Sequence, residues 1–229
     1  MKRIIVAIDG PSGSGKSTLG KRLARRLGYQ YIDTGAMYRA VAWRALQAGI
    51  DLDDPGAVTR VAGDLRIELE PRADGVGVRV DGRDVTDAIR TPDVAQGASK
   101  VSAIPAVRRV LVRIQQELGR RGGIVMDGRD IGTVVFSHAE VKVYLDASEE
   151  ERARRRCAED AARGVSTDMA ATRQAIRERD RRDKTREDSP LRCADDAYYL
   201  DSTGLTIDEV LDRIEALVEQ RRGESCSRD

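Results

Sequence analysis

The chain has 229 residues, of which 40% are hydrophobic and 34% charged, and its 40 Lys and Arg residues against 39 Asp and Glu residues leave a formal net charge of +1. This size and balance favour one sizeable α/β domain with insertions, or a core with small subdomains. They argue against binding of nucleic acid through bulk charge. Aromatic residues make up only 3% of the chain, too few for platforms on which single-stranded nucleic acid would stack.

Two further patterns concern the location of the protein. No apolar run approaches the roughly 20 residues of a membrane span, and the first apolar run begins at Ile4, which leaves no room for a signal peptide ahead of it. The three cysteines, Cys157, Cys193 and Cys226, match no metal or redox spacing. We therefore expect reduced thiols in a cytoplasmic protein that binds neither membrane nor nucleic acid.

The first predicted element is an apolar strand over residues 4–9, followed by a glycine-rich loop and a helix over 15–27. The loop fits G-x-x-x-x-G-K-[ST] in the strand–loop–helix context that this pattern requires. Its backbone N–H groups would bind the phosphates of ATP, with Lys16 at the β- and γ-phosphates and the Ser17 hydroxyl on Mg²⁺. The alternative is a glycine-rich turn whose Lys and Ser are solvated. The predicted ATP-binding residues of this stretch are Gly10, Pro11, Ser12, Gly13, Ser14, Gly15, Lys16, Ser17 and Thr18.

Helices, one strand and a small sheet are predicted next. Residues 29–33 have the pattern of a strand and residues 34–49 that of a helix, and a shorter helix is expected within 51–64. Beyond it, apolar and polar side chains alternate and Asp-Gly pairs stand at the turns, which predicts an antiparallel hairpin or a three-stranded sheet. Two further helices open at Pro92 and Pro105.

The remaining elements continue the alternation of strands and helices. In chain order they are strands over 124–127, 141–145 and 198–201, two helices within 148–184 divided at Gly164, and a helix over about 206–220. The tail over 221–229 has no apolar pattern and is expected to fray. This order predicts a mostly parallel sheet with helices on both faces. Asp9, Asp33, Asp127 and Asp146 end its strands, so they would meet at one ligand crevice.

Three polar groups near that crevice indicate a small phosphorylated acceptor. Arg39 follows the second strand, residues 127–130 add Arg129 and two carboxylates at another strand end, and residues 177–186 are dense in cations. Each has a plainer alternative: a surface Arg, a turn after a strand, and a solvated helix face with i,i+4 ion pairs. Asp127 could support Mg²⁺ or cap a neighbouring turn.

Five stretches of the chain together resemble the bacterial cytidylate kinases. They are residues 10–18, 33–39, 89–99, 127–136 and 179–186, within a resemblance that runs from about residue 3 to 218. It implies a P-loop NTPase-type parallel sheet flanked by helices, with a small antiparallel β insert in the monophosphate-binding region and a helical lid. The implied organisation is one kinase domain over 1–220, with its core at about 1–64, 92–147 and 197–220, its insert at about 65–91, its lid at about 148–165, and a flexible tail over 221–229.

The resemblance also assigns roles to single residues. Arg39 and Arg129 resemble the clamp on the acceptor's phosphate, and Thr34 stands where the family commonly has Ser. The cytosine readers would be Ser99, Arg108 and Asp130, and the group at the ribose and phosphates would be Arg179, Asp183 and Arg186. Arg152, Arg155 and Arg156 resemble lid arginines, of which Arg155 is assigned to ATP. The catalytic residues implied are Lys16, Arg129 and Arg179.

The implied chemistry suits these residue types. The carboxylate of Asp130 can accept a hydrogen bond from the amino group of cytosine, whereas it would face a carbonyl oxygen in uracil. A phosphate monoester has a second pKa of about 6, so the acceptor is already anionic and needs no general base. We expect a monomer that transfers the γ-phosphoryl group of Mg²⁺-bound ATP to CMP and dCMP. The alternatives are another small-molecule P-loop kinase and a nucleotide-dependent regulatory NTPase.

Overall fold

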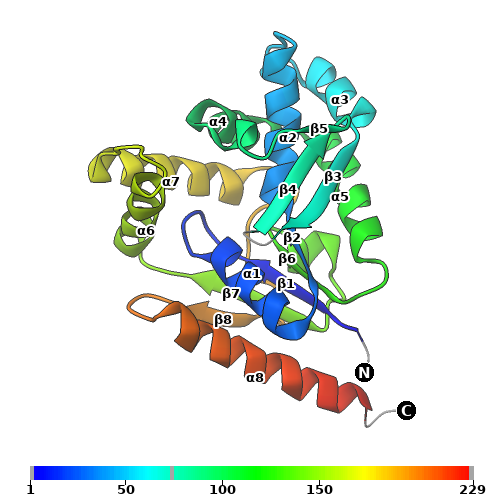
Figure 1. The fold of residues 1–229 in the computed structure, drawn as a ribbon, viewed down its shortest axis with the longest axis vertical. Coiled ribbons are helices and arrows are strands. Elements are labelled where there is room, and N and C mark those ends of the chain that lie inside the picture. Colours follow the sequence, from blue (N-terminus) through cyan, green and yellow to red (C-terminus); the bar gives the residue numbers. More distant parts are fainter. Residues whose placement is uncertain (1–2, 73–74, 227–229) are drawn as a thin grey trace. The chain divides into compact units, whose positions relative to one another are not determined.

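The computed structural model describes residues 3–72 and 75–226, without the side chains of 224–226. The chain forms two compact units, whose elements are labelled in Figure 1. The first unit consists of the chain up to residue 29 and from residue 122 onward, and the second consists of residues 30–121. Within the described ranges, no helix combines the length and the apolar composition that crossing a membrane demands.

A parallel sheet forms the centre of the first unit. Its strands lie in the order β6 (Ile124–Asp127), β1 (Ile5–Asp9), β7 (Val141–Asp146) and β8 (Tyr198–Asp201). All five residues of β1 are buried, as expected of a central strand that is covered on both faces. Ile8 pairs with Asp127, and Asp9 pairs with Tyr144. The carboxyl ends of three strands therefore meet at one edge of the sheet.

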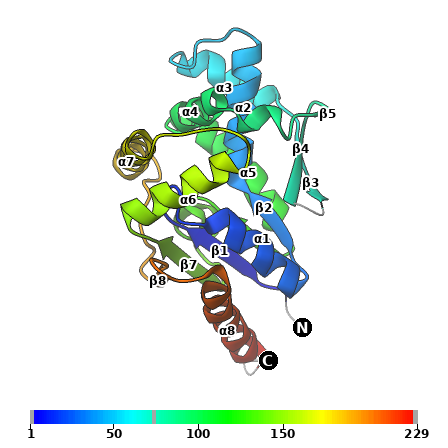
Figure 2. The ribbon, with the colours of Figure 1, turned by 60° about the vertical axis from the view of Figure 1, so that its left-hand side comes forward.

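Helices cover this sheet and extend beyond it (Figure 2). They are α1 (Lys16–Leu27), the π-helical turn η2 (Ile131–Val135), α6 (Glu149–Ala161), α7 (Met169–Thr185) and α8 (Ile207–Cys226). Helix α1 packs on β1 and β6, α8 packs on β7, and the two helices contact each other. Arg26 of α1 joins them through ion pairs with Asp212 and Glu215, at 2.8 and 2.7 Å. Helices α6 and α7 pack against each other as a pair.

The second unit combines helices with a three-stranded antiparallel sheet. Its elements are β2 (Gln30–Asp33), α2 (Thr34–Gln47), α3 (Pro55–Asp64), β3 (Ile67–Arg72), β4 (Gly75–Val80), β5 (Arg83–Asp84), the 3-10 turn η1 (Ala88–Arg90), α4 (Pro92–Val101) and α5 (Pro105–Gly119). One apolar core joins the helices to β3 and β4, and Trp43 is buried in it. Gly97 allows α4 to approach α2, because a Cβ there would lie 3.2 Å from Cβ of Ala42.

The predicted α/β class with a small antiparallel sheet is confirmed. The division of the charged region at Gly164 is also confirmed, since that glycine lies between α6 and α7. The expected fraying from residue 221 is wrong as far as Cys226, because α8 continues to that residue. The Arg222 guanidinium supports the extension by lying 5.0 Å from the ring centre of Tyr29 and by pairing with Glu219. Residues 227–229 lie outside the described chain, and the predicted boundaries of insert and lid stay predictions.

Candidate active site

The loop between β1 and α1 has the geometry of an anion-binding loop. Gly13 and Gly15 adopt left-handed backbone conformations, with φ of 77° and 94°. At Gly10 a Cβ would lie 2.0 Å from the carbonyl oxygen of Leu145, so only glycine fits there. The residue that caps the start of α1 is Gly15, which has no side chain to accept a hydrogen bond from the first turn. The first N–H groups of α1 and the positive end of its dipole therefore point to a place where a phosphate would bind.

Lys16 lies folded back on this loop. Its Nζ donates hydrogen bonds to the carbonyl oxygen of Pro11 at 2.6 Å and to Oγ of Ser14 at 3.2 Å. Burial, and then the positive charge of Arg129, lower the pKa of Lys16 well below its usual value, although Asp127 acts in the opposite direction. An anion bound at the loop would reverse this effect. The site is thus short of negative charge, as a site for a triphosphate should be.

The Ser17 hydroxyl donates a hydrogen bond to Oδ2 of Asp127 at 3.1 Å. This places a hydroxyl and a carboxylate, both ligands suited to Mg²⁺, at the carboxyl end of β6. Among the two alternatives for Asp127, the contact with Ser17 favours the one that supports a metal. The described residues contain no group of three or more His, Cys, Asp and Glu side chains that could hold a metal alone. A metal here would need oxygen ligands from the nucleotide as well.

Asp9 fixes the segment that follows Arg129 and Asp130. Its two carboxylate oxygens accept hydrogen bonds from the backbone N–H groups of Ile131 at 2.8 Å and Gly132 at 2.7 Å, at the start of η2. The side chain is buried, and burial raises the pKa of Asp9 to about 7 although the two backbone hydrogen bonds act to lower it. Asp9 thereby ties the end of β1 to the loop that carries two of the predicted acceptor-binding residues.

The raised pKa of Asp9 predicts a pH-dependent stability difference between the wild type and Asp9→Asn. Between about pH 4 and 7 the folded state holds a proton on Asp9 that the unfolded state has lost. The free energy of unfolding of the wild type should therefore fall relative to the variant as the pH rises through this window, by at most about 1.4 kcal/mol per pH unit, and level off above it. Urea unfolding of both proteins at several pH values measures this, and a difference that does not change with pH would contradict the prediction.

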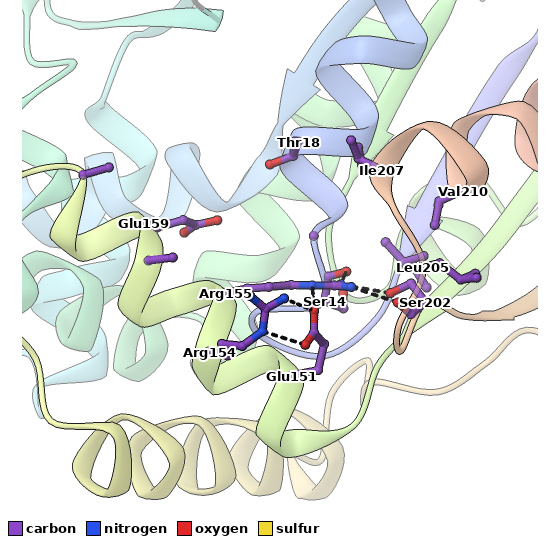
Figure 3. Close-up of a pocket in the computed structure, with 14 residues that line it drawn as sticks. Ser14, Thr18, Glu151, Arg154, Arg155, Glu159, Ser202, Leu205, Ile207 and Val210 are labelled. Atoms are coloured by element: carbon purple, nitrogen blue, oxygen red, sulfur yellow. Dashed lines mark hydrogen bonds and ion pairs between the residues drawn. The ribbon is translucent and has the colours of Figure 1, made fainter.

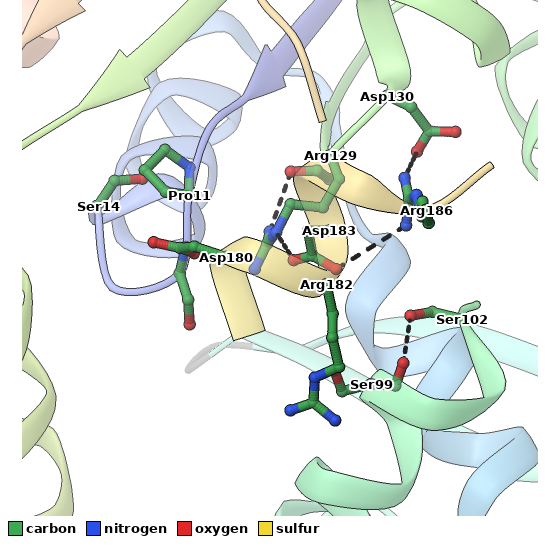
Figure 4. Close-up of polar contacts among 12 residues, drawn as sticks. Pro11, Ser14, Ser99, Ser102, Arg129, Asp130, Asp180, Arg182, Asp183 and Arg186 are labelled. Atoms are coloured by element: carbon green, nitrogen blue, oxygen red, sulfur yellow. Dashed lines mark hydrogen bonds and ion pairs between the residues drawn. The ribbon is translucent and has the colours of Figure 1, made fainter. Parts of the chain in front are cut away.

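A cluster of alternating charges lies beside the loop (Figure 4). Nε of Arg129 donates to Oδ2 of Asp183 at 3.0 Å, and Arg186 lies 3.9 Å from Asp183 and 3.7 Å from Asp130. Burial alone would raise the pKa of Asp183, but the guanidinium groups of Arg129, Arg179 and Arg186 outweigh it and lower that pKa. Asp183 therefore stays ionised and balances part of the positive charge of these arginines.

This geometry argues against the alternative in which residues 177–186 form only a solvated helix face. Asp180 and Asp183 are buried, and only 5% of the Arg186 side chain is exposed. Arg182 Nε donates to the carbonyl oxygen of Glu178 at 3.4 Å. One side of α7 therefore turns its charged residues into the unit, and its other side carries solvated ones.

A pocket of about 470 Å³ opens next to the loop, between α6 and the start of α8 (Figure 3). Apolar residues of this pocket include Leu205, Ile207 and Val210. Arg155 crosses its floor: Nε donates to Glu151 at 2.8 Å, and Nη2 donates to the carbonyl oxygen of Ser202 at 2.8 Å. These bonds hold the guanidinium group in place at the pocket.

The three arginines that resemble lid arginines thus differ in their surroundings. Arg155 lines the pocket beside the loop, as its assignment to ATP would require. Arg156 lies on another side of α6, where its Nε donates to Asp160 at 3.1 Å. Arg152 is buried and forms an ion pair with Asp180.

The other predicted acceptor residues belong to the second unit. Nη2 of Arg39 donates to Oδ2 of Asp33 at 2.9 Å, and Thr34 is buried at the start of α2. Arg108 donates to the carbonyl oxygen of Ser102 at 3.2 Å, which places it at the end of α4 near Ser99. The Ser99 hydroxyl is buried, and it has no hydrogen-bond partner within the part of the chain that the structure describes. A buried hydroxyl of this kind needs a partner from water or from a ligand.

The predicted site residues therefore divide between the two units. The first unit brings together the loop over 10–18, Arg155, the 129–130 pair and the charged side of α7. The second unit holds Thr34, Arg39, Ser99 and Arg108.

Asp180 and Ser202 also contact the loop or its pocket, and no local pattern predicts them. Asp180 is one acid in a run of charges, and Ser202 is one serine in a turn. Their significance depends on residues more than 140 positions away in the sequence, as the separation of 168 between Ser12 and Asp180 illustrates.

The sequence of the chain matches known proteins. A family model described as cytidylate kinase matches residues 6–220. The chain belongs to the cytidylate kinase family. A cytidylate kinase from Anoxybacillus flavithermus is 51% identical over 220 residues, which cover 96% of this chain and 98% of that protein. One from Geobacter sulfurreducens is 51% identical over 218 residues, with 95% and 94% covered.

Membership of the cytidylate kinase family makes the chain a kinase, which is a phosphotransferase. Among solved structures, an uncharacterized protein from Eubacterium ventriosum matches 96% of this chain and 99% of its own with a TM-score of 0.54. Because that protein is only 13% identical, the match shows the fold alone.

Proposed function

We propose that this chain transfers the γ-phosphoryl group of ATP to CMP and dCMP and so forms the corresponding diphosphates. The observation that carries the proposal is the charge distribution of the first unit. A loop with an uncapped helix start and Lys16 lies in the same unit as the cluster of Arg129, Asp183 and Arg186. One part suits a triphosphate, and the other suits a second, smaller phosphorylated ligand.

ATP would occupy the loop and the neighbouring pocket. Backbone N–H groups over 13–15 would bind its phosphates, and Lys16 would leave Pro11 and Ser14 for the β- and γ-phosphates. The base would enter the pocket against the face of Arg155 and the apolar side chains beyond it. The protein would recognise the adenine base there mainly through its shape and through stacking.

The acceptor would be held by arginines and read by polar side chains. Arg39 and Arg129 would clamp its phosphate, and Arg179, Asp183 and Arg186 would hold its ribose and phosphate, with Thr34 beside them. Ser99, Arg108 and Asp130 would read cytosine. Two observations support this role. The buried Ser99 hydroxyl has no hydrogen-bond partner among the described residues, and the Asp130 carboxylate is also buried.

Catalysis would then rest on positioning and charge. The acceptor's phosphate is already anionic at neutral pH, so none of the residues has to remove a proton. Lys16, Arg129 and Arg179 would neutralise charge as the phosphoryl group moves in line from one oxygen to the other. The desolvation that lowers the pKa of Lys16 would be offset only when anionic phosphates bind. The charged form of Lys16 is therefore favoured when ATP is bound.

The oxygen ligands present fit Mg²⁺. Ser17 and Asp127, whose side chains are hydrogen-bonded to each other, would hold it together with phosphate oxygens of ATP. When bound, Mg²⁺ would supply positive charge to the β- and γ-phosphates. We further propose that the protein works as a monomer in the cytoplasm, without nucleic acid or membrane as a partner.

A coupled assay of ADP release tests the function. We expect CMP and dCMP to stimulate ADP release strongly over the rate with ATP alone, and UMP and AMP to do so far less. A preference for another small acceptor would favour a different P-loop kinase. If no monophosphate stimulates the reaction, a regulatory NTPase becomes the better account and the proposal is wrong.

A further inference from the structure

Arg152 and Asp180 form a buried ion pair that the mechanism above does not use. Arg152 lies on α6 and Asp180 on α7, and their side chains are only 6% and 9% exposed. A buried ion pair is weak evidence of stabilisation, because desolvation of both charges offsets most of their attraction. Another role therefore has to be considered, and the contacts of the pair suggest one.

Both partners bind the same residue of the anion-binding loop. The Ser12 N–H donates to Oδ1 of Asp180 at 3.0 Å, and Nη1 of Arg152 donates to the carbonyl oxygen of Ser12 at 2.9 Å. Figure 4 shows the Asp180 side chain directed toward the loop between Pro11 and Ser14. The loop tip is thus held from both sides by charged groups of α6 and α7.

The backbone of α6 touches the loop as well. A Cβ on Gly13 would lie 2.9 Å from the carbonyl oxygen of Arg152, and Nε of Arg152 donates to the carbonyl oxygen of Ala147 at 3.0 Å. These contacts leave little free space between the loop and the start of α6. A displacement of Ser12 or Gly13 by bound phosphates would therefore be passed to the ion pair.

Helix α7 connects the pair to the acceptor side. Asp180 directly follows Arg179, and Asp183 lies three residues further along the same side of the helix. Asp183 binds Arg129 at 3.0 Å. The charges of Arg129, Arg179 and Asp180 all act on Lys16, so these groups and the loop already share one electrostatic environment.

We propose that Arg152 and Asp180 are positioning residues that couple the donor loop to α7, so that a triphosphate on the loop raises the affinity for the acceptor. The proposal rests on the proposed function, since it takes ATP and CMP as the two ligands. Thermodynamic linkage requires that CMP raises the affinity for ATP by the same factor. The pair acts through the loop and the helix and touches neither ligand.

Titration calorimetry measures the coupling. The dissociation constant of CMP is determined with and without saturating Mg²⁺ and the β,γ-imido analogue of ATP, which binds without transferring its phosphoryl group. We expect a ratio of about tenfold for the wild type. Asp180→Asn should lower it to less than about twofold, because Ser12 and Arg152 donate to different oxygens of the carboxylate, and an amide replaces one of these oxygens with an NH₂ group that cannot accept.

Arg152→Lys is the second variant, and it keeps the charge beside Asp180. A lysine ammonium cannot reproduce the planar fork that joins Asp180, Ser12 and Ala147, so the ratio should fall here as well. Melting temperatures show whether each variant folds. If one variant does not fold, the other still tests the proposal.

The matched control is Glu149→Gln. Glu149 also joins α6 to α7, through an exposed ion pair with Arg177 at 2.6 Å, but it does not touch the loop. This variant should keep the wild-type ratio. A merely structural role for the buried pair would lower stability and both binary affinities and leave the ratio unchanged.

Three results would overturn the proposal: a wild-type ratio near one, an unchanged ratio in Asp180→Asn and Arg152→Lys, or an equal loss in Glu149→Gln. None of these three results would contradict the proposed function if the wild type turns over CMP. If the wild type does not turn over CMP, the proposed function is wrong. The ADP-release assay on the same preparation tests this separately.

Discussion

Lys16→Met is expected to lower kcat about 1,000-fold and to leave the thermal stability of the free protein unchanged or higher. The loss follows because Lys16 is the charge that would meet the β- and γ-phosphates, and a single positioned charge in such a site contributes about this much to the rate. The stability should not fall, because the folded protein disfavours the charged form of this buried Lys, as its lowered pKa indicates.

Two measurements check this result. Single-turnover kinetics with CMP give the rate of transfer, and thermal unfolding gives the stability of the same preparations. Lys21→Met is the matched control, because it makes the same change about 1.4 turns further along α1 and outside the loop. Equal kcat values for Lys16→Met and the wild type would show that Lys16 does not contribute to the transfer. A large drop in melting temperature would show that its bonds to Pro11 and Ser14 are structural instead.

Asp130→Ala is expected to reduce kcat/KM for CMP about 100-fold while that for UMP changes little or rises. The carboxylate would accept from the amino group of cytosine, and the loss of a charged, buried hydrogen bond costs about 2–3 kcal/mol. With uracil the carboxylate would oppose a carbonyl oxygen, and its removal relieves that repulsion. The preference for CMP over UMP should therefore narrow.

Asp130→Asn sharpens this test, because the variant keeps the shape of the side chain beside Arg186, which lies 3.7 Å away in the wild type. Its amide can donate to the uracil carbonyl, so UMP should gain more from Asn than from Ala. The KM for ATP is the internal control and should stay the same in both variants. If the ratio of CMP to UMP turnover is unchanged, Asp130 does not read the base.

The elements and the anion-binding loop could be predicted from the sequence because local patterns encode them. The strand over 4–9, the glycines of the loop and the helix that starts at Lys16 are neighbours in the chain, and their spacing is tied to the conformation that they adopt. The same holds for the break at Gly164 and for the alternation that predicts the antiparallel sheet. The end of α8 was not predictable, because Arg222 is held by the distant ring of Tyr29.

The roles of single charges within the site depend on contacts between distant segments. Asp9 and Gly132 are 123 residues apart, and nothing in either stretch alone predicts that one binds the other. In the same way, the sequence does not distinguish Arg152, Arg155 and Arg156, which all belong to one charged helix. The packing of α6 decides that Arg152 faces the loop, Arg155 the pocket and Arg156 the solvent.

The sequence by itself determined the class of fold, the loop for a triphosphate and, through the resemblance of five stretches, the family to which the chain belongs. Tertiary structure alone decided which charges are buried and what each one touches. The physical reason is that a backbone conformation is set by neighbouring residues, whereas the pKa of Asp9 and the pairing of Arg152 with Asp180 are set by desolvation and by partners that the fold brings from elsewhere.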